Sequence, residues 1–103
     1  MEFKLEAKNT DEFLVLYPKG ELDVYNTKNF KEKTIKFYEK DKKDILFDCK
    51  DLEYLDSTGL GSLIYILKEV EKEDHKIVIE NLNPSIMKLF KITKLEDMFE
   101  IRG

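Results

Sequence analysis

The sequence predicts a single α/β domain, residues 1–103, in which helices pack against a mixed β-sheet of about four or five strands. Three observations support this fold class. The chain begins with two strand-like segments, then alternates between helix-like and short apolar segments. Such alternation is typical of parallel strands joined by right-handed helical crossovers. A length of 103 residues suffices for one buried core but not for two.

The N-terminal segments 3–7 and 13–17 are expected to be strands joined by the polar turn 8–12, which makes an antiparallel hairpin. Pro18 should end the second strand, because proline has no N–H to donate to a ladder. The chain then enters a loop in which Gly20 can adopt backbone angles closed to other residues.

The next segment, 28–40, has the pattern of an amphipathic helix, and either Asn26 or Thr27 can serve as its N-cap. Its apolar side is expected to include Phe30, Thr34 and Phe37, with Ile35 and Tyr38 nearby. The following run 44–49 is short, apolar and bounded by charge, as expected of a parallel strand buried on both faces.

The clearest helix is predicted for 59–73, where apolar residues repeat at helical spacing: Leu60, Leu63, Ile64, Leu67 and Val70. A buried strand is predicted for 76–80. A third helix is expected over 84–95, opened by Asn83 with Pro84 at its first position. A short final strand is expected within 98–102.

The charge pattern argues against nucleic acid and membranes as partners. The net charge is −4 and both signs are interspersed, so nothing in the sequence resembles the basic stripe that nucleic acid requires. No apolar run approaches the roughly 20 residues of a membrane span, and the N-terminus lacks the features of a secretory signal, so we expect a cytoplasmic protein. Cys49 is the single cysteine, which fits a reducing compartment and offers no disulfide or cysteine metal site.

The stretch "LEYLDSTGLGSLIYIL", residues 52–67, carries the main functional signal. It places Asp56, Ser57 and Thr58 after a buried strand and a turn, at the start of a helix, and partners usually dock at the carboxyl ends of such strands. Ser57 is expected to be the helix N-cap. Gly59 and Gly61 each weaken a helix by roughly 1 kcal/mol relative to alanine. We interpret these two glycines as leaving the helix backbone uncovered by side chains, so that another molecule can approach it closely.

The motif matches no common catalytic signature. It lacks the lysine of a phosphate-binding loop, the spacing of a dinucleotide fingerprint and the first glycine of a nucleophile elbow. His75 lies in the polar run "EKEDHK" and is expected to be a solvated loop residue, whereas Cys49 is expected in the core. The alternative of a small enzyme that uses Asp23, Asp56 and Ser57 is supported by neither a metal-ligand cluster nor a candidate base. We therefore expect a binding protein with no catalytic activity and no cofactor.

Three segments, "GELDVYNT" (20–27), "LDSTGLGSL" (55–63) and "NLNPSIMKLFKITKLEDMFEI" (81–101), resemble the bacterial anti-sigma factor antagonists of the STAS domain family. The resemblance covers nearly the whole chain and implies a STAS-type fold. It also implies partner switching: the unmodified protein binds an anti-sigma factor that is a serine kinase, which frees a sigma factor. Phosphorylation of a serine ends the binding, and a serine phosphatase restores it.

The resemblance puts phosphorylation at Ser57, with Thr58 as the second candidate acceptor. The partner-binding residues that it implies are Asp23, Asp56, Ser57, Thr58, Gly59 and Gly61. Taken by itself, Asp23 is a turn aspartate that caps its own loop. The alternative function is a STAS interaction subunit of a stress-signalling or transporter-associated complex, whose serine is never modified. The sequence does not indicate an oligomeric state.

Overall fold

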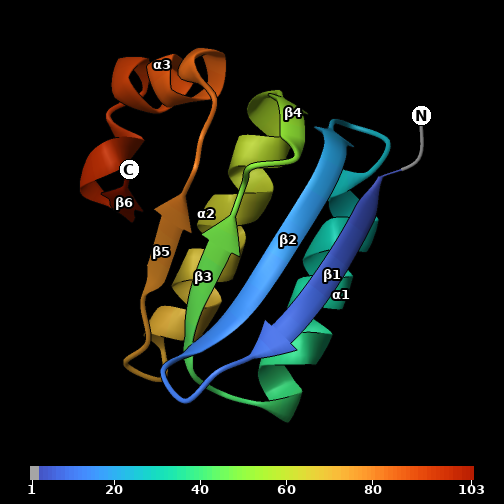
Figure 1. Cartoon of the computed structure of the whole chain (residues 1–103), viewed down its shortest axis with the longest axis vertical. Coiled ribbons are helices and arrows are strands. Elements are labelled where there is room, and N and C mark those ends of the chain that lie inside the picture. The colour runs from blue at the N-terminus through green and yellow to red at the C-terminus, as the bar shows by residue number, and fades with distance from the viewer. Residues whose placement is uncertain (1–2) are drawn as a thin grey trace.

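The computed structural model describes residues 3–103, so the first two residues of the expected domain lie outside the described part (Figure 1). The strands are β1 (Lys4–Asn9), β2 (Phe13–Leu22), β3 (Asp44–Asp48), β4 (Leu52–Leu55), β5 (Ile77–Glu80) and β6 (Glu100–Arg102). The helices are α1 (Thr27–Lys40), α2 (Ser57–Glu71) and α3 (Pro84–Ile92), followed by a 3-10 turn, η1 (Leu95–Asp97). The predicted helices and the final strand are therefore confirmed.

The sheet is mixed, as expected. Its order is β1-β2-β3-β5-β6, and β4 pairs separately with β2, which gives six strands rather than four or five. Strands β1 and β2 form the predicted antiparallel hairpin, and every other pairing is parallel. The additional strand is β4, in a segment that the sequence had suggested was a turn.

Pro18 does not end β2, which continues to Leu22, so this expectation was wrong. The reason is that β2 changes its parallel partner along its length. Residues 13–16 pair with β3, and residues 20–22 pair with β4. Pro18 falls in the interval between these pairings, where its missing N–H removes no hydrogen bond to either strand. Gly20 has a φ of 102°, as its predicted freedom allows, but it lies at a strand irregularity beside β4 rather than in a loop.

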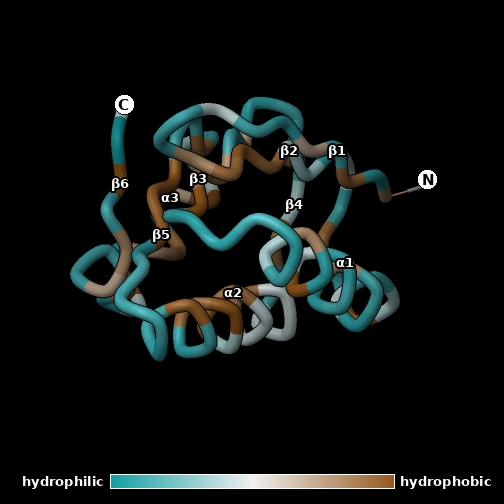
Figure 2. The backbone as a smooth tube through the Cα atoms, turned by 90° about the horizontal axis from the view of Figure 1, so that it is seen from below, coloured by the Kyte–Doolittle hydropathy of each residue, from teal (hydrophilic) through white to brown (hydrophobic). Residues whose placement is uncertain are grey.

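Helices α1 and α2 lie side by side against one face of the sheet (Figure 2). The main core between these layers receives alternate residues of the strands, such as Leu14 and Leu16 of β2. The intervening Val15 joins Leu46 and Val78 in a smaller cluster on the opposite face. The interiors of β3 and β5 are accordingly buried on both sides, as predicted.

In α1, the fully packed residues are Phe30, Thr34 and Tyr38, spaced four apart. Phe37, which was expected on the buried face, is only half-buried, because the helix turns Tyr38 into the core instead. The hydroxyl of Tyr38 lies 2.6 Å from Nδ1 of His75. His75 is thus a half-buried hydrogen-bonding residue that links α1 to the turn before β5, and not the solvated residue that the sequence suggested.

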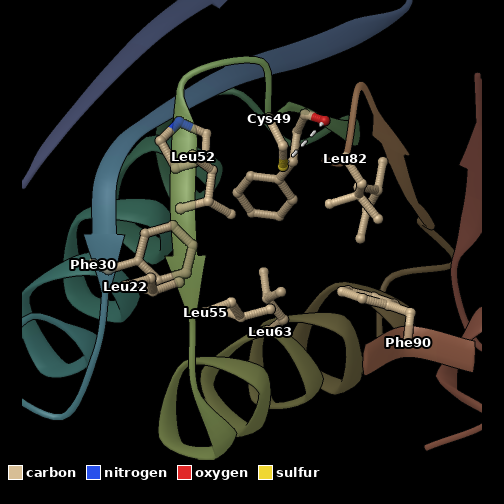
Figure 3. A pocket seen from close by; sticks show the side chains of 11 residues that line it. Leu22, Phe30, Cys49, Leu52, Leu55, Leu63, Leu82 and Phe90 are labelled. Atoms are coloured by element: carbon tan, nitrogen blue, oxygen red, sulfur yellow. Dashed lines mark hydrogen bonds between the residues drawn. The ribbon is translucent and has the colours of Figure 1, made fainter. Parts of the chain in front are cut away.

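Cys49 is a buried core residue, as expected. It lines a small apolar pocket between the sheet and the helices, together with residues that include Leu22, Leu55, Leu63 and Phe90 (Figure 3). The volume of this pocket is about 10 Å³, comparable to a single water probe, so it is a packing defect rather than a ligand site.

Candidate functional site

The candidate site is built from two segments: the β2–α1 loop, residues 23–26, and the start of α2, residues 56–61. Each segment directly follows a strand, and these strands are parallel neighbours whose last residues, Leu22 and Leu55, are in register. The amide of Asp56 also donates to the carbonyl of Leu22 at 3.3 Å. The two segments therefore leave the sheet next to each other, at the carboxyl ends of their strands.

Asp56, not Ser57, is the N-cap of α2, which corrects the sequence-based assignment. Its backbone is extended, and its Oδ1 accepts from the amide of Gly59 at 2.9 Å and from the hydroxyl of Thr58 at 2.6 Å. Ser57 is the first helical residue. The motif offers three polar residues in succession, each suited to capping, so sequence alone left the boundary uncertain by one position.

The cap holds the Asp56 carboxylate in its charged form. Partial burial of the carboxylate acts to raise its pKa, but hydrogen bonds from the Thr58 hydroxyl and the Gly59 amide outweigh burial. The backbone amides of Thr58 and Val24 act in the same direction, so the pKa of Asp56 lies below its ordinary value. The contribution of Val24 indicates that the β2–α1 loop reaches the carboxylate of the α2 cap.

The two candidate phosphate acceptors differ in their hydrogen bonding. Both Ser57 and Thr58 are exposed. The Thr58 hydroxyl is engaged by Asp56, whereas within residues 3–103 the Ser57 hydroxyl has no hydrogen-bond partner. Ser57 also stands at the N-terminus of a 15-residue helix, where free amides and the helix dipole favour a negative charge. Its environment is therefore the more suitable one for a phosphoryl group.

Asp23 organises its own loop, in line with the simpler interpretation of its sequence. Its Oδ1 accepts from the amide of Tyr25 at 3.0 Å and from the side-chain amide of Asn26 at 3.2 Å. Its carbonyl accepts from the amides of Asn26 and Thr27, both at 3.0 Å. Asn26 precedes α1 but makes no side-chain cap, because its side-chain amide donates to Asp23 and to the carbonyl of Glu21 instead.

The two glycines of the motif have different roles. Gly59 is buried, and a Cβ built on it would lie 2.6 Å from both the carbonyl oxygen of Leu22 and Cδ1 of Leu55. Gly59 therefore permits α2 to pack against the ends of β2 and β4, and its interpretation as a bared surface was wrong. Gly61 is exposed, with no atom within 4 Å of such a Cβ, so it does leave the backbone open.

Several exposed residues near the site were not identified from sequence. Val24 and Tyr25 in the β2–α1 loop are 60% and 88% exposed, and Tyr65 on α2 is 46% exposed. The signal for the first two was an apolar pair within the otherwise polar stretch 23–27, since an exposed tyrosine in a loop often serves binding. The sequence around Tyr65 carries no such signal, because Tyr65 becomes part of this surface only when α1 packs against α2.

The described residues contain no group of three or more histidine, cysteine, aspartate or glutamate side chains arranged to hold a metal ion. Within the same part of the chain, no helix combines the length and apolarity needed to cross a bilayer. The geometry at the start of α2 is suited to recognition by a macromolecule, because Ser57, Thr58 and Gly61 are exposed on a helix start that Asp56 holds in place.

Comparison with known proteins agrees with this description. A family model of the STAS domain matches residues 4–103. The anti-sigma-B factor antagonist of Bacillus subtilis (strain 168) is 33% identical over 101 residues, which span 98% of this chain and 92% of that protein.

Two solved structures share the fold. An anti-sigma factor antagonist from Mycobacterium paratuberculosis has a TM-score of 0.88 and 18% identity, with 99% of this chain and 86% of that chain covered. The Bacillus cell-fate determinant SpoIIAA in its phosphorylated form has a TM-score of 0.72 and 23% identity, with 99% and 92% covered. Since the domain model matches almost every residue and the Bacillus subtilis relative aligns nearly end to end, the chain belongs to the STAS domain family.

Proposed function

We propose that this protein is an anti-sigma factor antagonist that works by partner switching in the cytoplasm. Its unphosphorylated form binds an anti-sigma factor that is also a serine kinase, and so releases a sigma factor. Phosphorylation of Ser57 ends this binding, and a serine phosphatase restores it. The binding surface comprises Asp23, Asp56, Ser57, Thr58 and Gly61, whereas Gly59 contributes indirectly, by allowing α2 to dock on the sheet.

The observation that carries the proposal is the exposed Ser57 hydroxyl at the first position of α2, which has no hydrogen-bond partner among residues 3–103. A kinase can reach this oxygen without unfolding the helix. The neighbouring Thr58 hydroxyl is held by Asp56 at 2.6 Å and must break that bond to react. The names of the relatives support the same role, since the Bacillus subtilis relative is an anti-sigma-B factor antagonist and SpoIIAA is known in a phosphorylated form.

The switch requires no change of fold. A phosphoryl group brings a charge of about −1.5 to −2 at neutral pH. At the N-terminus of α2 this charge is favoured by the helix dipole, so phosphorylation leaves the domain as stable as before or slightly more so. Binding is lost at the interface, because the added bulk and charge occupy the surface that the partner contacts.

The test is phosphorylation by the serine-kinase anti-sigma factor of the same genome. Incubation with that kinase and ATP should add one phosphate to the wild-type chain and to Thr58→Ala, and none to Ser57→Ala, as measured by intact mass. Ser57→Ala should still bind the kinase. A phosphate that persists in Ser57→Ala and disappears in Thr58→Ala would move the acceptor to Thr58. No phosphate on the wild type, together with stable binding to other STAS proteins, would favour the non-switching subunit.

A further inference from the structure

A groove runs between α1 and α2 and has one end at the start of α2. Residues that line it include Lys28, Lys31, Lys36, Thr58, Gly61 and Tyr65. We call this surface the α1–α2 groove. We propose that it is a cationic docking site for an acidic helical segment of the partner, and that the charge of phosphorylated Ser57 controls its occupancy. This inference rests on the proposed function and adds the chemistry of the partner surface.

The charge of the groove is opposite to that of the whole chain. The net charge of the protein is −4, yet three lysines line the groove and Glu32 is the one acidic residue that lines it. Among residues 3–103, none of the three lysines forms a salt bridge. Positive charges without partners on an acidic domain create a local potential that attracts carboxylates.

The groove also offers apolar contact. The ammonium of Lys31 lies 4.5 Å from the centre of the Tyr65 ring, so the two side chains meet across the groove. Tyr65 remains 46% exposed, and Ile35 is half-buried beside it. Open space above Gly61 lets a backbone approach closely near the Ser57 end. An occupant therefore needs apolar side chains for Tyr65 and Ile35 as well as carboxylates for the lysines.

The spacing of the lysines matches a helix of about two turns. Lys28 and Lys36 are eight residues apart on α1, a distance of about 12 Å at 1.5 Å per residue. Carboxylates spaced three to four residues apart on an opposing helix would meet Lys28 and Lys31 in turn. Lys36 lies five residues beyond Lys31 and lines the other end of the groove. An amphipathic helix laid between two helices is a common mode of peptide recognition.

Phosphorylation of Ser57 would act on the end of the groove that lies at the start of α2. Thr58 lines the groove, and Ser57 is the adjacent residue in the first turn of α2. A phosphoryl group on Ser57 would offset the positive potential of the nearest lysines and repel the carboxylates of the occupant. The same charge that the α2 N-terminus tolerates would thus exclude an acidic partner.

The test compares charge reversal inside and outside the groove. Lys28→Glu and Lys31→Glu reverse lysines of the groove. Lys33→Glu is the matched control, since Lys33 belongs to the same helix, is exposed and does not line the groove. It lines a neighbouring hollow next to Phe37, which shares Lys36 with the groove. Binding of each full-length variant to the serine-kinase anti-sigma factor is measured by calorimetry, and folding is checked by thermal unfolding.

We expect each groove variant to weaken binding by about tenfold and Lys33→Glu to change it by less than about twofold. Wild-type affinity should fall as salt rises from about 50 to 300 mM, and this dependence should be smaller for Lys28→Glu. Lys28 lies in the first turn of α1, where glutamate is favoured by the helix dipole, so this variant should fold even if Lys31→Glu does not.

Equal effects of all three reversals, or none from either groove variant, would overturn the docking site while leaving the proposed function intact. Binding of ATP or inorganic phosphate that is lost in Lys28→Glu, with unchanged binding to the anti-sigma factor, would also overturn it. Failure of the wild type to bind or be phosphorylated would instead refute the proposed function, and the inference with it.

Discussion

The hydroxyl of Thr58 donates a 2.6 Å hydrogen bond to Oδ1 of Asp56, the same oxygen that caps α2 through the amide of Gly59. This bond to Asp56 Oδ1 has two consequences. It stabilises the start of the helix, and it occupies the hydroxyl next to Ser57. Ser57, the proposed acceptor, is thus distinguished from Thr58 by hydrogen bonding rather than by exposure.

Replacing Asp56 by alanine should lower the free energy of unfolding by about 1 kcal/mol, because the Gly59 amide and the Thr58 hydroxyl lose their acceptor. Asp56→Asn should cost less, since asparagine is also an effective N-cap. The pKa of the folded carboxylate is below its unfolded value of 3.8, so its stabilising contribution is present above pH 3.8 and is lost as the pH falls below it. Urea unfolding of wild type and Asp56→Asn across this range should show their difference shrinking on acidification; a constant difference would contradict the assignment.

The two glycines of the motif should respond oppositely to alanine. Gly59→Ala should destabilise the domain by about 1–3 kcal/mol, because the new methyl group meets the Leu22 carbonyl and Leu55 at 2.6 Å. Gly61→Ala should stabilise it by about 0.5–1 kcal/mol, because its methyl group enters open space within a helix. Chemical denaturation measures both. If Gly61→Ala is more stable yet binds the anti-sigma factor less tightly, the glycine serves recognition; equal or tighter binding would remove Gly61 from the interface.

Ser57→Asp should weaken binding to the anti-sigma factor by at least tenfold, about 1.4 kcal/mol, while the thermal midpoint stays nearly unchanged. A carboxylate at the first helical position is favoured by the dipole, so the fold has no reason to respond. Calorimetry and thermal unfolding provide the two measurements. An unfolded Ser57→Asp protein would show that the serine has a structural role.

Cys49 should make the domain sensitive to alkaline pH. Burial, aided by the charge of Asp48, raises the pKa of its thiol from 9.0 to about 12. The contribution of the thiol to stability is complete below pH 9 and is lost as the pH rises toward 12, by roughly 1 kcal/mol per pH unit. Cys49→Val, which keeps an apolar side chain of similar size, serves as the control for other titrating groups. If both proteins lose stability equally between about pH 9 and 11, the thiol is accessible to solvent in the folded state.

The helices and strands that were predicted correctly are those marked by capping residues or apolar patterns within the element itself. Asn83 and Pro84 marked the start of α3, and Asn83 does accept from the amide of Ile86 at 2.9 Å. The periodic apolar residues of α2 and the short apolar runs of β3 and β5 were similarly unambiguous. The STAS-type fold followed once the three motif segments were considered together, and the family model confirms it.

What the sequence could not predict depends on contacts between distant segments. Strand β4 has Leu52 and Leu55 buried around two exposed residues, a spacing without the period of two that identifies a strand. It is a strand because β2 continues past Pro18 to pair with it. The packing role of Gly59 depends on that same pairing, since the atoms that approach it belong to Leu22 and Leu55.

The sequence named candidate residues for the site but could not predict what surrounds them. Asp23 and Asp56 were identified, and the structure brings their two segments together through Leu22 and Val24. The α1–α2 groove was not foreseen, because Lys31 and Tyr65 are far apart in sequence and meet only when the helices pack. A lysine-rich helix surface is otherwise indistinguishable from an ordinary solvated one.

The change of partner along β2 has a consequence for the rate at which complexes form. Strand β2 leads directly into the loop that contains Asp23. Because the end of β2 pairs with β4, it also fixes the point at which α2 begins. Both segments of the proposed binding surface are thus anchored to β2 before any partner is met. Little ordering is left for the moment of association, so the domain should dock as a rigid body, and collision frequency and long-range attraction should govern its on-rate.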